Sequence, residues 1–123
     1  TISFVCSGGP KLLSGEALTD AVLAIEPFTP AAILVNCTPM DETAACLEAM
    51  SRVTHLPFGA YPNAGFITPS GGWTPDPTLT PARFAAIARD WLRTGAQVLG
   101  GCCGTTPDHI RSLREALPLV LVE

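Results

Sequence analysis

The chain has 123 residues and a formal net charge of −4, and only 15% of its residues are charged. This length suits a single domain, and no basic patch indicates a nucleic-acid partner. No apolar run reaches the roughly 18 residues of a membrane helix. The five cysteines come with no recognisable secretory signal, which disfavours a disulfide framework and predicts a cytoplasmic protein.

Four short apolar runs have the pattern of buried strands: residues 2–5, 31–35, 58–61 and 97–100. A segment with helical spacing of apolar residues follows each run. The apolar positions of these segments are Leu18, Ala21, Val22 and Ile25; Cys46, Leu47, Met50 and Val53; Phe84, Ile87, Ala88 and Trp91; and Ile110, Leu113 and Leu117.

Three Thr-Pro pairs indicate where helices begin. Threonine is a favourable N-cap, and proline is tolerated at the first helical position because its missing N–H would be unpaired there. The pairs begin at Thr38, Thr80 and Thr106, and Gly95 is a plausible helix stop.

Strands that alternate with helices imply a parallel sheet with right-handed crossovers. Two architectures fit four such units: an open doubly wound sheet and an arc of a (βα)8 barrel, which needs about 250 residues when complete. An isolated arc would leave two strand edges free, which predicts pairing with another chain.

The stretch GGCCGTTP at residues 100–107 places two cysteines side by side after the fourth predicted strand. Neighbouring Cα atoms are about 3.8 Å apart, whereas a disulfide favours about 5.5–6 Å. A bridge between Cys102 and Cys103 is therefore disfavoured, and metal binding is the leading interpretation. The adjacent glycines leave room for both side chains to turn toward one ion.

Cys37 follows the second predicted strand, so it belongs to the same sheet edge as Cys102 and Cys103. The carboxyl ends of parallel strands are where such folds place their chemistry. Three thiolates suit Zn²⁺, which in catalytic sites keeps a fourth position open. The helix that begins at Pro107 points its positive end at these thiolates. A lone strand-end cysteine is often a small buried hydrophobe, so both roles stay open for Cys37.

The remaining cysteines and the histidines are expected to lie outside the metal site. Cys46 lies on the apolar face of its helix, and Cys6 is expected to pack in the core. His55 precedes Pro57 in a turn, and His109 is expected to be solvated near a helix start.

Three motifs carry a resemblance to a known family: VNCTP at residues 35–39, YPNAG at 61–65 and GGCCGTTPDHI at 100–110. They resemble the homocysteine S-methyltransferase family and follow its motif order. The resemblance covers essentially the whole chain but only the carboxyl-terminal half of the family's barrel. It implies an α/β fold of four consecutive (βα) units, half of a (βα)8 TIM-type barrel with parallel strands, in one domain over residues 1–123.

The resemblance also implies a chemistry. In the family three cysteines bind zinc, which implies Cys37, Cys102 and Cys103 as metal ligands and, through the metal, as catalytic residues. The thiol of homocysteine takes the fourth position as a thiolate and attacks an activated methyl group, giving methionine. These residues do not identify the methyl donor.

The resemblance further implies that Asn36 and Asn63 orient the ligands or line the substrate pocket. Tyr61 is a further candidate for substrate binding, and it could point into the barrel mouth or into the helix layer. Asn63 also suits a turn at residues 62–65, and both interpretations stay open. Residues 62–80 contain four prolines and three glycines, which predicts a long irregular connection, either a lid with Trp73 as its anchor or a loose loop. The apolar tail at residues 118–123 is a candidate strand for association.

The family's amino-terminal half carries the acidic and glycine residues of the first strand and the glutamate that helps hold the homocysteine amino group, and no residue here matches them. We therefore expect a truncated enzyme, one part of a split enzyme, or a homo-oligomer that closes a pseudo-barrel. The rival class is a non-catalytic metal-binding or oligomeric α/β module. A thiol redox protein is disfavoured because the chain has no Cys-x-x-Cys motif.

Overall fold

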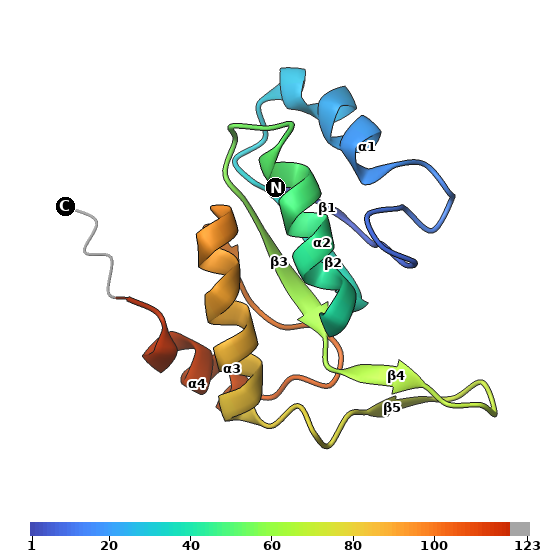
Figure 1. Cartoon of the computed structure of the whole chain (residues 1–123), viewed down its shortest axis with the longest axis vertical. Helices are drawn as coiled ribbons and strands as arrows, with labels where there is room; N and C mark the ends of the chain where they lie inside the picture. The colour runs from blue at the N-terminus through green and yellow to red at the C-terminus, as the bar shows by residue number, and fades with distance from the viewer. Residues whose placement is uncertain (119–123) are drawn as a thin grey trace.

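The computed structural model describes residues 1–118. Its main sheet has four parallel strands in the order β1 (Ile2–Phe4), β2 (Ile33–Pro39), β3 (Phe58–Asn63) and β6 (Val98–Leu99). The helices that follow these strands are α1 (Leu18–Ile25), α2 (Met40–Ser51), α3 (Pro81–Asp90) and α4 (Pro107–Ala116). Short 3-10 helices extend α1 at Glu26–Phe28 and α3 at Trp91–Thr94. The predicted mixed α/β fold with a parallel sheet is confirmed (Figure 1).

The strands lie in the sheet in the same order as in the chain. A doubly wound sheet reverses its strand order at one point, and this sheet has no such reversal. Every crossover therefore advances in one direction, and right-handed crossovers then place the helices on one face. In Figure 1, α2 crosses in front of β2 and β3.

The two faces of the sheet differ because side chains alternate along a strand. The register pairs Ile33 with Phe58 and Val35 with Ala60, and these four side chains belong to the hydrophobic core. Helix residues complete that core: Leu18, Val22, Leu47, Met50, Phe84 and Leu113. The opposite face carries the polar residues Ser3, Asn36 and Tyr61 together with Leu34 and Val98, so it is more polar than the helix-covered side.

Strand and helix boundaries depart from the prediction at β2. The strand continues to Pro39, so Thr38 is a strand residue and α2 begins at Met40. Thr38 is buried, and its hydroxyl accepts the Cys6 amide N–H at 3.0 Å instead of capping a helix. The other two Thr-Pro predictions are confirmed, since Thr80 and Thr106 are the N-caps of α3 and α4.

The predicted irregular connection over residues 62–80 is wrong. It contains an antiparallel hairpin of β4 (Gly65–Ile67) and β5 (Trp73–Pro75), which projects beyond the main sheet in Figure 1. The turn between them contains Gly71 in the left-handed region, with φ of 85°. The predicted association strand at residues 118–123 lies almost entirely outside the described residues. None of the helices within residues 1–118 has both the length and the apolar character of a membrane span.

Candidate metal centre

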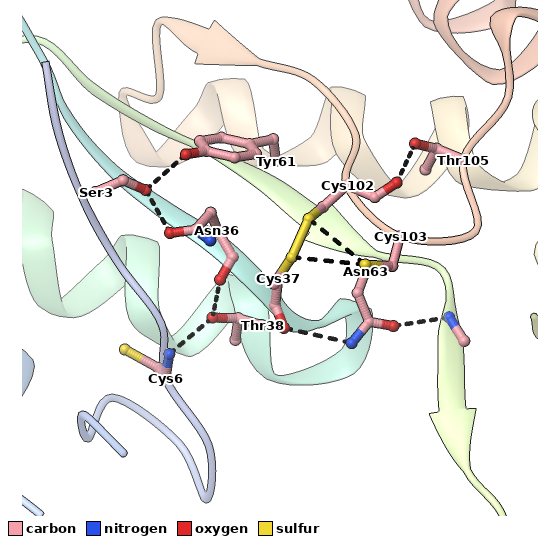
Figure 2. The surroundings of a disulfide bond; sticks show 11 residues. Ser3, Cys6, Asn36, Cys37, Thr38, Tyr61, Asn63, Cys102, Cys103 and Thr105 are labelled. Carbon is pink, nitrogen blue, oxygen red and sulfur yellow. Dashed lines mark hydrogen bonds between the residues drawn. A yellow bond between two sulfur atoms is a disulfide. The ribbon is translucent and has the colours of Figure 1, made fainter. Parts of the chain in front are cut away.

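Three cysteine sulfurs converge at the carboxyl ends of β2 and β6. The Sγ atoms of Cys37, Cys102 and Cys103 all lie within 4.8 Å of one another (Figure 2). Cys37 and Cys102 are half-buried, whereas Cys103 is exposed. The sequence prediction that cysteines 65 residues apart meet at one sheet edge therefore agrees with this geometry.

Cys37 has an unusual backbone conformation, with φ of 47° in the left-handed region. The pairing of β2 with β3 shifts register between Asn36 and Pro39, so the chain bulges at Cys37. Asn63 at the end of β3 donates from Nδ2 to the Cys37 carbonyl at 3.3 Å and accepts the Gly65 amide N–H at 2.8 Å. Left-handed non-glycine residues concentrate at functional sites, and here Asn63 holds one in place.

Backbone hydrogen bonds fix the Cys102–Cys103 turn against the end of β3. The Cys102 amide donates to the Pro62 carbonyl at 2.9 Å, and the Cys103 carbonyl accepts from the Ala64 amide at 2.8 Å. Thr105 donates to the Cys102 carbonyl from its hydroxyl at 2.6 Å and from its amide at 3.2 Å. The turn is therefore tied to the end of the neighbouring strand as well as to Thr105, which precedes the N-cap of α4.

The structure joins Cys37 to Cys102 by a disulfide bond, with the Cα atoms 5.6 Å apart. The sequence-based expectation of a chain without disulfides is wrong for this pair. The expectation that Cys102 does not bridge its neighbour Cys103 is confirmed, since Cys103 is free. The disulfide and a metal ion would use the same two sulfurs, so the two states exclude each other.

The donor set nevertheless fits a zinc ion. Zn–S bonds of about 2.3 Å in a tetrahedral site place the sulfurs about 3.8 Å apart. The Cys103 sulfur already lies 3.9 Å from that of Cys37 and 4.0 Å from that of Cys102. Reduction of the Cys37–Cys102 bond would free two more thiolates, and the amino end of α4 favours negative charge at this edge.

Asn36 and Tyr61 form a separate polar row on the uncovered face. The Ser3 hydroxyl donates to Asn36 Oδ1 at 2.6 Å and accepts from the Tyr61 hydroxyl at 3.0 Å. Figure 2 shows this row beside the three sulfurs. Of the three residues expected to contact substrate, the structure brings Asn63 into contact with Cys37 and places the other two in this row.

A cavity of about 620 Å³ opens beside the sulfurs, and Cys37 and Asn63 both contribute to its wall. Its other walls carry the apolar side chains Leu13, Phe66, Ile67 and Trp73 and the charged side chains Asp41, Glu42, Asp76 and Arg83. Hydrogen bonds from the Thr78 hydroxyl and amide lower the pKa of Asp76 below its ordinary value, so this carboxyl group is ionised at neutral pH.

The other two cysteines are buried, as predicted. Cys6 is 1% exposed and Cys46 is fully buried. A hydrogen bond with Cys6, together with burial, raises the pKa of the Cys46 thiol well above its ordinary value, so this thiol stays neutral. The prediction of a solvated His109 is wrong, because its imidazole is buried and fully hydrogen-bonded.

The sequence prediction missed the β4–β5 hairpin and the burial of His109, although the sequence contains a weak signal for each. Phe66-Ile67 and Trp73-Thr74 flank the Gly71-Gly72 pair, which is a short hairpin pattern. His109 stands three residues after the N-cap Thr106, the position whose side chain reaches back in a capping box.

The glycine of the cysteine turn has a specific structural role. Gly104 has φ of 79°, and a Cβ there would lie 2.9 Å from both the Ala64 carbonyl oxygen and the Trp73 ring. We expect Gly104→Ala to destabilise the fold by about 2–3 kcal/mol, since it adds overpacking to backbone strain. The measurement is the free energy of unfolding in urea.

Gly71→Ala is the matched control for that substitution. Gly71 has φ of 85° but nothing within 4 Å of an added Cβ. Its substitution should cost about 1 kcal/mol from the backbone alone. If the two substitutions lowered the free energy of unfolding equally, the contact between the cysteine turn and the hairpin would contribute nothing to stability.

Taken together, the fold and the site define an α/β protein with a three-sulfur centre at the carboxyl ends of parallel strands. The homocysteine S-methyltransferase family model matches residues 1–117. Homocysteine S-methyltransferase 1 of Zea mays is 32% identical over 119 residues, which cover 94% of this chain and 37% of that protein.

Solved structures agree with this match. The homocysteine methyltransferase MmuM from Escherichia coli, in its metallated form, aligns with a TM-score of 0.70 at 30% identity, covering 92% of this chain and 34% of that one. Its oxidized form aligns with a TM-score of 0.68 at 31% identity, over 86% and 32%. The chain therefore belongs to the homocysteine S-methyltransferase family, and it spans about a third of the length of these relatives.

Proposed function

We propose that this chain supplies the zinc-binding part of an enzyme that transfers a methyl group to the thiol of homocysteine, giving methionine. The observation that carries this proposal is the convergence of three sulfurs from two strand ends beside a cavity. The names of the relatives support the substrate, because they are homocysteine methyltransferases.

Cys37, Cys102 and Cys103 would hold the zinc ion as thiolates after reduction of the disulfide. Bound zinc would supply a Lewis acid that keeps a substrate thiol deprotonated at neutral pH. Asn63 positions Cys37 through its carbonyl, and the amino end of α4 stabilises the thiolates of the turn. Three thiolates with one divalent ion carry a net charge of −1, which keeps a bound sulfur electron-rich.

The cavity beside Cys37 is the proposed space for substrate. Its apolar walls offer contacts to a reacting methyl group, and its carboxylates at Asp41, Glu42 and Asp76 favour a positively charged group. We place the polar row of Asn36 and Tyr61 on the same substrate side, where it would orient polar atoms of the amino acid.

We also propose that the sheet is half of a (βα)8 barrel that is completed by association. The unreversed strand order, the sheet face that no helix within residues 1–118 covers and the partial coverage of the relatives support this arrangement. The completing part is a second copy or the amino-terminal half that this sequence does not include. One chain has a mass of 12.8 kDa. Light scattering after size-exclusion chromatography should show a larger mass, either for the chain alone or for its mixture with an amino-terminal half. A monomer in both samples would contradict it.

The test of the function uses Co²⁺ in place of zinc, because cobalt–thiolate bonds absorb in the near ultraviolet. Addition of homocysteine to the reduced, Co²⁺-loaded chain should increase this absorption, whereas homoserine, which has no thiol, should not. Methionine formation from homocysteine and S-methylmethionine then separates an enzyme from a non-catalytic metal-binding module. Equal spectra with both amino acids, in the chain alone and in its mixture with an amino-terminal half, would refute homocysteine binding.

A further inference from the structure

His109 is a buried polar side chain to which the proposed chemistry gives no role. It is 8% exposed, and its ring meets that of Phe84 edge-on with centroids 5.4 Å apart. Nδ1 lies 3.1 Å from the Thr106 amide nitrogen, and Nε2 lies 2.9 Å from the Leu79 carbonyl oxygen. Since the amide can only donate, Nδ1 accepts, and the neutral ring carries its proton on Nε2 and donates it to Leu79.

The two ends of this imidazole reach two different parts of the site. Thr106 directly follows Thr105, whose amide and hydroxyl both bind the Cys102 carbonyl. Leu79 lines the cavity and precedes Thr80, the N-cap of α3. The ring therefore connects the metal-ligand turn to the cavity wall across a gap of 30 residues in sequence.

We propose that His109 is a positioning residue that holds the Cys102–Cys103 turn in its metal-binding place through the Leu79 hydrogen bond. This inference rests on the proposed metal centre. A rigid ring with an acceptor on one side and a donor on the other fixes the distance between its two partners. Groups that orient metal ligands from outside typically change metal affinity 10–100-fold when they are replaced.

His109→Asn is the decisive variant because it separates the two contacts. The asparagine Oδ1 can still accept the Thr106 amide N–H, so the start of α4 stays capped. Its side chain is too short to reach Leu79, so the cross-link is lost together with the edge-on contact to Phe84, and the loss of packing needs its own control. We expect Co²⁺ affinity, measured on the reduced chain by competition with a chelator, to fall at least about 10-fold.

Leu113→Ala is the matched control for lost stability. Leu113 is a buried residue of the same helix, 2% exposed, that lies four positions beyond His109 and packs in the core. We expect this variant to unfold more easily but to bind Co²⁺ as tightly as the unsubstituted chain.

Three results separate the possible failures. Unchanged Co²⁺ affinity in His109→Asn would show that the residue only caps a helix and would overturn the proposal. An equal loss of affinity in Leu113→Ala would overturn it as well, because general destabilisation would then explain the effect. If the unsubstituted chain bound no Co²⁺, the metal centre itself would be refuted.

Discussion

The reduced chain should bind about one zinc ion, and the double variant Cys102→Ser, Cys103→Ser should retain less than about a tenth of it. A serine hydroxyl stays protonated at neutral pH, so the variant loses two of three anionic ligands that zinc prefers. The free sulfur of Cys103 already lies 3.9 Å from that of Cys37. The measurement is zinc per chain by elemental analysis after purification without chelator.

Two further variants sharpen this test. Cys37→Ser leaves the adjacent pair intact and should still remove most of the zinc, because the third ligand comes from another strand. Cys46→Ala removes a buried thiol outside the site and should leave the zinc content unchanged. Similar zinc in the double variant and the unsubstituted chain would mean that these cysteines do not form the site.

Metal binding should depend on the redox state of the Cys37–Cys102 pair. In the disulfide-bonded chain two of the three sulfurs are bonded to each other, so only Cys103 can act as a thiolate. Reduction by a phosphine adds two electrons and two protons to the disulfide and restores both thiols. We expect Co²⁺ affinity to rise at least about 100-fold on reduction, since a full ligand set replaces a single thiolate.

The matched control for this prediction is Cys103→Ser. That variant retains the disulfide partners but lacks the third sulfur, so reduction should raise its Co²⁺ affinity far less. The converse should also hold, with bound zinc slowing disulfide formation by occupying the thiolates. Tight binding by the fully oxidised chain, verified by a thiol count of three free cysteines, would contradict the prediction.

Local sequence patterns predicted the elements that carry the site. Apolar runs and Thr-Pro pairs identified the four strands and two helix starts because they depend on neighbouring residues. The sheet edge shared by Cys37 and Cys102 followed from a general rule, since the carboxyl ends of parallel strands lie together. The start of α2 was misplaced because the Thr38 hydroxyl has a buried partner, the Cys6 amide, from the segment that follows β1.

The types and strand-end positions of the three cysteines were determined by the sequence alone, as was the alternation of strands and helices. The Cys37–Cys102 bond, the Asn63 contact with the Cys37 carbonyl and the burial of His109 were decided only by the tertiary structure. Each joins residues 26 to 65 positions apart. Local propensity contains no information about such pairs, because their distances depend on how the strands register and how the turns pack.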